Sequence, residues 1–391
     1  MNPAHSEEPL PLGTVAIFRH QLFKRSEPFI ADQAQQLLRF RPLYLGRERV
    51  SDSPTGADSA SLSDVTAQRR FTSRVWQVLT RDPRPYLELI RDRKPRLVHA
   101  HFGVDAVYAL PLARRLEVPL ITTFHGYDAT MSSAALLRSG KPAWWNYVLF
   151  RRAVAEHGTL FICISEYIRR RVIALGFPER RTRVHYIGVN TDEIRPNAQA
   201  ADRPTILHVA RLVEKKGTRD LIEAVALVAR VVPDVVLLII GEGPLERTLR
   251  KLVQERDLGN VVHFLGAQSH ARVLELMSQT WLFALPSVEA RSGDAEGLGI
   301  VLLEAAACGI PAVANRHGGI PEVVLDGATG RLCAEHQIDE LAGALTDLLK
   351  DDSLRRRMGN AARERAQRYF SLKKQSAALE SIYQEVLGSA P

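Results

Sequence analysis

The chain has 391 residues, 46% of them hydrophobic and 25% charged, so it is long enough for two domains and too apolar to be disordered throughout. No segment approaches the roughly 20 consecutive apolar residues of a transmembrane helix, and residues 1–12 lack the apolar core of a secretory signal. The net charge of +8 comes from residues 1–200, where 29 basic residues face 19 acidic ones, and this half suits nucleic acid, an anionic membrane or a phosphorylated ligand.

Short apolar runs alternate with amphipathic stretches along the first half. Strands are predicted at 14–18, 42–45, 96–100, 120–124, 159–164 and 183–187. Helices are predicted at 29–40, 104–116, 143–154 and 166–175. The small polar segment 51–63 predicts a mobile surface loop. Apolar strands that are each followed by a helix are typical of a parallel sheet covered on both faces.

The alternation repeats in the second half. Strands are predicted at 205–209, 235–240, 261–265, 281–285, 311–314 and 330–333. Helices are predicted at 218–231, 245–256, 271–277, 299–307 and 338–350. Segment 188–204 has no hydrophobic period and reads as a linker. We therefore expect an α/β protein of two doubly wound domains, 1–190 and 205–365, which bind ligands in a cleft at the carboxyl ends of their strands, and a C-terminal helix, 366–391, packing back on the first domain.

The most informative stretch is EARSGDAEGLGIVLLEAAACGIP, residues 289–311. Its predicted helix begins with the free amides of Gly299, Ile300 and Val301, which form an anion site suited to a diphosphate. Glu296 precedes these amides and Glu304 lies about 12 Å further along the helix, so each carboxylate is placed to bind a sugar at one end of the diphosphate. Alternatively, Glu296 only complements the helix dipole and Glu304 only faces solvent.

Other motifs occur in a fixed order along the chain. They are HAHFG at 99–103, TFHGYD at 123–128, LHVARLVEKKG at 207–217, GEGP at 241–244 and FLGAQSH at 264–270. With the two glutamates, this set resembles the retaining glycosyltransferases of family four, which have the GT-B fold. It is most similar to the bacterial exopolysaccharide branch, of the colanic-acid or amylovoran type.

This resemblance implies a donor site in the second domain. Glu296 would contact hydroxyls of the transferred sugar as a catalytic residue, and Glu304 the ribose. The basic pair on the diphosphate would be Arg211 and Lys216, positively charged where the leaving group gains negative charge. Three further positions complete the predicted donor site, namely Gly241, Leu265 and Gln268. Loop lysines and arginines are otherwise usually solvated.

The resemblance also assigns residues of the first domain. It places His125 beside the donor sugar and the reacting oxygen as a second catalytic residue, with Asp128 close by. The loop after the first strand carries Ser26 and Glu27, expected to bind the acceptor together with Asp128 and His101. Although His99 and His101 alternate as a zinc-binding pair would, no third or fourth ligand is near, and we predict no metal site.

Two features remain open in the sequence. Trp144, Trp145 and Tyr147 lie among basic residues, which suits either a membrane interface or a buried helix with charged flanks. The three cysteines, Cys163, Cys308 and Cys333, have no metal-ligand spacing and predict reduced, buried thiols of a cytoplasmic protein.

The expected activity is transfer of a hexose from a nucleotide sugar, with UDP as the expected nucleotide, to a saccharide and lipid-linked acceptor in exopolysaccharide synthesis. No cofactor or metal is expected, because Arg211, Lys216 and the helix terminus offset the phosphate charge. The expected partners are the nucleotide sugar, the acceptor and an anionic membrane surface, and no nucleic acid. Two rivals stay open: a sugar-nucleotide epimerase of the same fold, and a non-catalytic sugar-nucleotide-binding scaffold.

Overall fold

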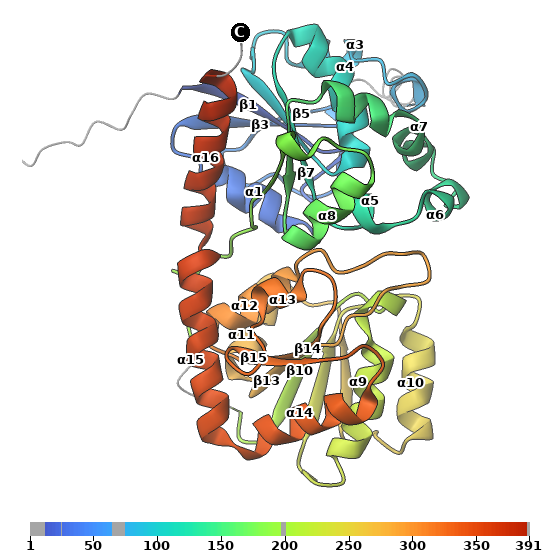
Figure 1. Ribbon diagram of the computed structural model, residues 1–391, viewed down its shortest axis with the longest axis vertical. Coiled ribbons are helices and arrows are strands. Elements are labelled where there is room, and N and C mark those ends of the chain that lie inside the picture. The colour runs from blue at the N-terminus through green and yellow to red at the C-terminus, as the bar shows by residue number, and fades with distance from the viewer. Residues whose placement is uncertain (1–11, 25, 65–74, 197–200, 389–391) are drawn as a thin grey trace, which may run out of the picture. The chain divides into compact units, whose positions relative to one another are not determined.

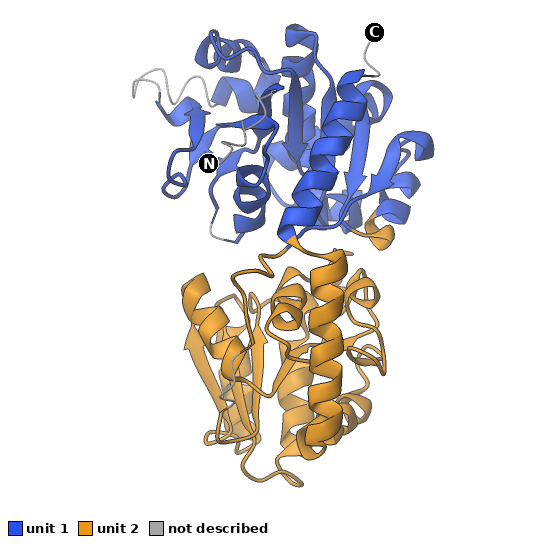
Figure 2. Ribbon diagram, turned by 90° about the vertical axis from the view of Figure 1, so that its left-hand side faces the viewer, with its two compact units in different colours: residues 1–164, 169–188, 372–391 blue, residues 165–168, 189–371 orange. Residues whose placement is uncertain are grey.

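The computed structural model describes residues 12–24, 26–64, 75–196 and 201–388. Two compact units make up the chain (Figure 2). The first unit comprises residues 1–164, 169–188 and 372–391, and the second comprises 165–168 and 189–371. The segment considered as a signal, residues 1–12, lies outside the described residues except for Leu12.

The first unit is built on a seven-stranded, fully parallel sheet with the order β5-β3-β1-β6-β7-β8-β9 (Figure 1). Its strands are β1 (Gly13–Phe18), β3 (Phe40–Gly46), β5 (Asp58–Ser61), β6 (Leu97–His101), β7 (Leu120–Phe124), β8 (Leu160–Cys163) and β9 (Thr182–Val184). A separate two-stranded pair joins β2 (Gln21–Leu22) to β4 (Glu48–Arg49). The strand order reverses between β1 and β6, so the carboxyl ends of these two strands form the natural ligand site of this sheet.

Helices pack on both faces of that sheet. They are α1 (Pro28–Gln35), α3 (Arg84–Leu89), α4 (Gly103–Leu116), α5 (Tyr127–Thr130), α6 (Ser133–Arg138), α7 (Pro142–His157), the part of α8 (Glu166–Ala174) from residue 169 on, and α16 (Leu372–Gly388), together with a helical segment at residues 75–80. The predicted return of the C-terminal helix is confirmed, because α16 belongs to the first unit and its Glu380 accepts the backbone N–H of Arg39 at 2.6 Å.

The second unit repeats the plan with a six-stranded parallel sheet of order β12-β11-β10-β13-β14-β15. The strands are β10 (Thr205–Val209), β11 (Val236–Ile240), β12 (Val262–Gly266), β13 (Leu282–Leu285), β14 (Ala312–Asn315) and β15 (Gly330–Cys333). The helices are α9 (Thr218–Val228), α10 (Glu246–Glu255), α11 (His270–Gln279), α12 (Ile300–Ala307), α13 (Ile320–Val323), α14 (Ile338–Lys350) and α15 (Asp352–Tyr369). Here the order reverses between β10 and β13, which sets the second ligand position.

The predicted α/β class with two parallel sheets is confirmed, and one local prediction is wrong. Segment 51–63 was expected to be a loop, yet Asp58–Ser61 forms the edge strand β5 on β3, and Ser61 is fully buried. This strand lacks the apolar pattern by which the other strands were predicted. Main-chain pairing, rather than apolar side chains, holds Asp58 and Ser59 at the sheet edge. The second unit also extends beyond the predicted 205–365, from Val189 to Ser371, so α15 belongs to it.

Two further observations concern the whole described chain. No helix among the described residues is long and apolar enough to cross a membrane. The cysteines Cys163, Cys308 and Cys333 are free and buried, as predicted, and burial raises the pKa of the Cys308 and Cys333 thiols to about 12. Cys308 and Cys333 are therefore unreactive core residues.

Candidate functional site

In the second unit, the predicted donor residues lie on the two loops that follow β10 and β13. Arg211 and Lys216 come after β10, and Glu296 comes after β13. Because these two strands are neighbours at the reversal of strand order, their loops meet at the carboxyl edge of the sheet. The structure thus brings the predicted basic residues and the first predicted glutamate to one place.

Lys216 and Glu296 form a buried ion pair, with 2.5 Å between Nζ and Oε2. Their side chains are only 14% and 11% exposed. Burial lowers the pKa of Lys216, partly opposed by Glu296. Burial also favours the neutral acid of Glu296, but the ammonium groups of Lys216 and Lys215 overcome this effect and lower its pKa to about 2. The glutamate is therefore held as a carboxylate that accepts hydrogen bonds.

The start of α12 offers unused donors beside this pair. Gly299 takes a left-handed conformation, with φ of +84°, and ends the loop that carries Glu296. Within the described part of the chain, no acceptor contacts the backbone N–H groups of Gly299, Ile300 and Val301. Arg211 is exposed, and its charge is close enough to lower the pKa of Lys216. Open amides and two cations together make a site for a multiply charged anion.

Close backbone contacts hold these loops in place. Gly318 has φ of +57°, and a Cβ there would lie 2.2 Å from the carbonyl oxygen of Glu296. Gly241 has φ of +124°, and a Cβ there would lie 2.0 Å from the carbonyl oxygen of Ala210. Such approaches leave no room for any other residue. Both positions therefore require glycine for packing within the protein, the contact of Gly241 with a donor stays a prediction, and the need for glycine at Gly318 was not predicted.

Three residues that the sequence analysis did not single out support Glu296. Its backbone N–H donates to Nε2 of His317 at 3.2 Å, so that nitrogen carries no proton and the other, Nδ1, donates to Glu335 at 2.7 Å. The hydroxyl of Ser287 lies 3.3 Å from the Glu296 carboxylate, and Lys215 pairs with Asp294 at 3.0 Å. Their only signal in the sequence is position, directly after the strands that end at this edge.

The remaining predicted donor residues lie on α12, at the end of β12 and just after it. Glu304 is bonded to Nε2 of His270 at 2.7 Å and its side chain is 14% exposed. Gln268 is exposed, and its amide donates to the carbonyl of Leu265 at 2.6 Å. The histidine orients the Glu304 carboxylate, which can accept a hydrogen bond from a hydroxyl. Leu265 and Gln268 lie at the end of the edge strand β12 and just after it, shortly before His270 in the chain, and their contact with a donor stays a prediction.

In the first unit, three histidines form a buried column. The rings of His99 and His101 stack with centroids 4.4 Å apart, and Nδ1 of His101 lies 3.0 Å from Nε2 of His125. His99 continues the column to the hydroxyls of Thr123 at 2.7 Å and Tyr383 at 2.6 Å. Burial lowers the pKa of His101 and His125 well below the ordinary value, and that of His99 to about 3. All three imidazoles are therefore neutral.

One ring nitrogen of the column, Nδ1 of His125, is both buried and without a hydrogen-bond partner among the described residues. Because the partner nitrogen Nε2 is bonded to His101, that contact fixes how the ring is oriented. His125 thus combines a fixed ring with a buried, unpartnered polar atom, which fits a residue that binds a substrate hydroxyl.

Asp128 shapes the loop that carries His125. Its carboxylate accepts the backbone N–H groups of Gly103 at 2.8 Å, Gly126 at 2.9 Å and His125 at 3.2 Å. Burial raises its pKa to about 6 even though these three donors oppose the shift. Asp128 is 1% exposed, so the observed contacts are those of a loop organiser, and its contact with an acceptor stays a prediction.

A buried charge network adjoins the histidines. Arg19 binds Glu27 through two hydrogen bonds, of 2.9 and 3.1 Å, and Asp105 at 2.5 Å. The guanidinium also lies 4.3 Å from the ring centroid of Phe102, which packs against His125. The predicted acceptor residue Glu27 is therefore held rigidly, whereas Ser26 is exposed on the same loop. Arg19 follows β1 directly, and that position was its only signal in the sequence.

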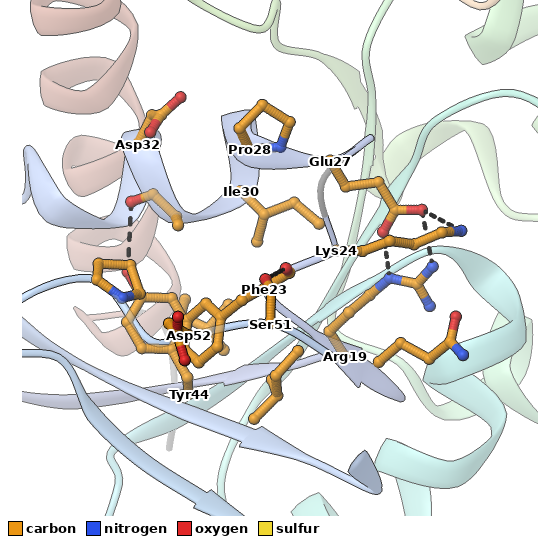
Figure 3. A pocket seen from close by; sticks show the side chains of 15 residues that line it. Arg19, Phe23, Lys24, Glu27, Pro28, Ile30, Asp32, Tyr44, Ser51 and Asp52 are labelled. Carbon is orange, nitrogen blue, oxygen red and sulfur yellow. Dashed lines mark hydrogen bonds and ion pairs between the residues drawn. The ribbon is translucent and has the colours of Figure 1, made fainter. Parts of the chain in front are cut away.

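A pocket of about 230 Å³ opens beside this network (Figure 3). It has an apolar side, which includes Leu22, Phe23, Ile30 and Tyr44, and a polar rim, which includes Arg19, Lys24, Glu27, Asp32 and Asp52. An apolar wall with a charged rim suits a ligand that has both a non-polar surface and hydroxyl groups. No group of three or more His, Cys, Asp or Glu side chains suited to a metal ion occurs in the described residues.

The two units match two family models. A model described as Glycosyl transferases group 1 matches residues 189–365, and one described as Glycosyltransferase Family 4 matches residues 47–193. A GDP-mannose-dependent alpha-(1-6)-phosphatidylinositol monomannoside mannosyltransferase of Mycolicibacterium smegmatis is 32% identical over 294 residues, covering 70% of this chain and 74% of the relative. The putative colanic acid biosynthesis glycosyltransferase WcaL of Salmonella typhimurium is 33% identical, covering 73% of this chain and 70% of WcaL.

The fold also matches solved structures. The Anabaena protein HepE, crystallised in complex with UDP and glucose, superposes with a TM-score of 0.74 at 19% identity, covering 95% of this chain and 99% of HepE. At that identity the likeness shows the fold alone, which is that of two Rossmann-like domains.

Proposed function

Because the chain belongs to the group 1 glycosyltransferases and has the GT-B fold, we propose that it transfers a hexose from a UDP-sugar to a saccharide acceptor with retention of the anomeric configuration. The likeness to a colanic acid enzyme supports a role in exopolysaccharide synthesis. The relative from Mycolicibacterium smegmatis, named for a phosphatidylinositol mannoside substrate, supports a lipid-linked acceptor and work at a membrane surface.

The observation that carries the proposal is the buried Lys216–Glu296 pair next to the open amides of α12. Lys216 and Arg211 would stabilise a diphosphate bound at Gly299–Val301. This electrostatic stabilisation would become stronger as the leaving group gains negative charge in the transition state. Glu296, kept ionised by the two lysines, would accept hydrogen bonds from hydroxyls of the transferred sugar. Glu304 and His270 would bind the ribose, with Leu265 and Gln268 at the base.

We assign the acceptor to the first unit. Glu27, which Arg19 holds in place, would accept a hydrogen bond from the acceptor hydroxyl, together with Ser26 and His101 of the same unit. The pocket behind Glu27 has an apolar wall for the non-polar face of a sugar or its lipid-side substituent. His125 would place its unpartnered Nδ1 against a substrate hydroxyl.

In the proposed reaction, the acceptor oxygen bonds to the anomeric carbon as the bond from that carbon to the phosphate oxygen breaks. Attack occurs on the face that the leaving group vacates, so configuration is retained, and the hydroxyl proton passes to a phosphate oxygen. Proton transfer to the leaving group needs no ionisable base, which suits the neutral His125. Because Arg211, Lys216 and the α12 amides offset the phosphate charge, we expect transfer to continue in the presence of a chelator.

The test compares Glu296→Gln with the matched variant Glu289→Gln, which alters an exposed glutamate of the same loop. The donors are UDP-glucose, UDP-galactose and GDP-mannose, each labelled in the sugar, and the acceptor is a membrane lipid extract. We expect the labelled sugar to appear in lipid-linked saccharide only when the donor is a UDP-sugar. Glu296→Gln should lower that rate by about a hundredfold or more while UDP still raises the melting temperature.

The alternatives make different predictions for the same experiment. An epimerase would convert the donor to an isomer without an acceptor, and a scaffold would bind the donor without turnover. Transfer from GDP-mannose alone would overturn the choice of nucleotide. Equal loss of activity in Glu296→Gln and Glu289→Gln would overturn the assignment of Glu296.

A further inference from the structure

Exposed apolar side chains are unevenly distributed in this protein. Among the described residues, eleven large apolar side chains are strongly exposed, and six of them lie on helix 75–80, α6 and α7 of the first unit. These six, the apolar patch, are Val75, Trp76, Leu79, Leu137, Trp145 and Leu149. Exposure is high, at 52% for Trp76, 65% for Leu79 and 67% for Leu149. Grouping on this scale marks an interaction surface rather than scattered exposure.

Direct contacts join the three elements that carry the patch. The amide of Asn146 on α7 donates to the carbonyl of Val78 at 2.7 Å, and the guanidinium of Arg81 lies 3.4 Å from the ring centroid of Phe150. The indole N–H of Trp145 donates to the carbonyl of Leu137 at 2.7 Å, which links α7 to α6. Both α6 and α7 lie at one margin of the first unit (Figure 1). The patch therefore lies on three elements that are in direct contact with one another.

The packing of α7 within the first unit does not use the side chains of the apolar patch. On α7, Tyr147 is fully buried and donates to the carbonyl of Asp128, and Trp144 stacks on Tyr127 with centroids 5.5 Å apart. The inward face of α7 thus accounts for one of the two neighbouring tryptophans. Trp145 and Leu149 lie one turn apart on another face, where packing within the unit leaves them 41% and 67% exposed.

Positive charge surrounds the patch. Residues 75–84 and 132–157 contain six basic side chains and two acidic ones. The two acidic residues are already paired, Asp82 with Arg84 at 2.6 Å and Glu156 with Arg152 at 2.9 Å. Arg138 and Lys141 are exposed and have no carboxylate partner within the described residues. The patch thus has an apolar centre and unpaired cations at its margin. These features complement a surface with an anionic outer layer over an apolar interior.

We propose that the apolar patch docks this enzyme on a lipid bilayer that contains anionic headgroups. Trp145, Trp76 and Leu149 would enter the boundary between headgroups and acyl chains, where indole rings are favoured. Arg138 and Lys141 would bind the phosphates of anionic lipids. Such docking would bring the enzyme close to the lipid-linked acceptor, and in this respect the inference rests on the proposed function.

The experiment measures sedimentation of the full chain with vesicles of phosphatidylcholine alone and of phosphatidylcholine mixed with phosphatidylglycerol. We expect binding to the anionic vesicles that falls as salt rises. Trp145→Ser with Leu149→Ser should lower the partition coefficient by about tenfold or more, and Arg138→Gln with Lys141→Gln by a similar factor. The controls are Val231→Ser, an exposed apolar residue of the second unit, and Arg170→Gln with Arg180→Gln, exposed cations of the first.

Each outcome decides between the proposals. A rise in melting temperature with UDP, without vesicle binding, would overturn the docking surface and leave the proposed function intact. Vesicle binding without any change in melting temperature on addition of UDP would support the docking surface and overturn the proposed function. Equal losses in the patch variants and their controls would show non-specific attraction of a basic protein. Self-association that Trp145→Ser with Leu149→Ser abolishes, with no vesicle binding, would assign the patch to a protein contact and also overturn the proposal.

Discussion

In the second unit, the polar groups at the carboxyl edge of the sheet are charged and paired, whereas in the first unit the central ones are neutral. Lys216 holds Glu296 as a carboxylate with a pKa of about 2. Burial instead keeps His101 and His125 uncharged and raises the pKa of Asp128 to about 6. One edge is thus prepared for an anion such as a diphosphate, and the other for neutral hydroxyl groups.

The largest expected effect comes from removing the lysine of the charged edge. Lys216→Met leaves the Glu296 carboxylate buried without its partner, and breaking such a pair destabilises a protein by about 3–5 kcal/mol. Chemical unfolding and UDP-induced thermal shift measure the result, and UDP should no longer stabilise the variant. Lys251→Met, which breaks an exposed pair with Glu255, is the control and should change stability by less than about 1 kcal/mol. Equal effects would show that burial of the Lys216–Glu296 pair is immaterial.

Backbone packing at the same edge supports the second prediction. Gly318→Ala should drive a methyl group into the carbonyl oxygen of Glu296 and displace it, at a cost of about 3 kcal/mol in unfolding free energy. Gly327→Ala is matched, because Gly327 has φ of +74° and nothing within 4 Å of its added Cβ. That control should lose only the left-handed backbone preference, about 1 kcal/mol. Similar losses in both variants would mean that the close approach does not position Glu296.

Acid should affect the two edges in opposite directions. Asp128 has a folded pKa above its unfolded value of 3.8, so its protonation stabilises the fold as pH falls through about 6. Glu296 has a folded pKa below its unfolded value of 4.5, so its contribution is present above that pH and is lost as pH falls toward 2.

Urea unfolding of the wild type, Asp128→Asn and Glu296→Gln at pH 7 and pH 4 separates the contributions of Asp128 and Glu296 to the free energy of unfolding. The stability gap between wild type and Asp128→Asn should widen by roughly 2 kcal/mol at pH 4, and that for Glu296→Gln should narrow by roughly 1 kcal/mol or less. Changes of the same sign in both variants would contradict the contrast between the edges.

The sequence predicted the strands more reliably than the contacts between loops. β7, β10 and β15 were predicted with their observed bounds, because a Pro or Gly marks where each one begins: Pro119 precedes β7, Pro204 precedes β10 and Gly330 opens β15. β5 was missed, since an edge strand needs no apolar pattern. Glu296 and Lys216 were found through motifs, but their direct pairing was not, because 80 residues separate them and only the strand order makes their loops neighbours.

The same limit applied to the histidines. Alternation placed His99 and His101 on one strand, but it gave no sign that His101 bonds to His125 or that His99 bonds to Tyr383, 284 residues away. Those contacts depend on the pairing of β6 with β7 and on the return of α16, which are properties of the tertiary structure.

His101→Phe tests the neutral edge. The ring keeps the stack on His99 but removes the hydrogen bond that orients His125, so we expect a fall in the transfer rate of about tenfold with an unchanged UDP affinity. His101→Asn, which restores a polar side chain of similar reach, should recover part of the rate and show that orientation is the cause. A weakened response to UDP in His101→Phe would mean that the two edges are not separate in function.

The smallest effect is expected at the far end of the histidine column. Tyr383→Phe removes the hydroxyl that bonds to Nδ1 of His99 and leaves that nitrogen buried, at a cost of about 1–2 kcal/mol in unfolding free energy. Tyr369→Phe is the control, because Tyr369 is 44% exposed, and it should change stability by less than about 0.5 kcal/mol. Since His99 meets His101 through a stack rather than a hydrogen bond, Tyr383→Phe should leave the transfer rate within about twofold of the wild type. A tenfold fall in rate without a loss of stability would instead show that the column relays orientation from α16 to His125.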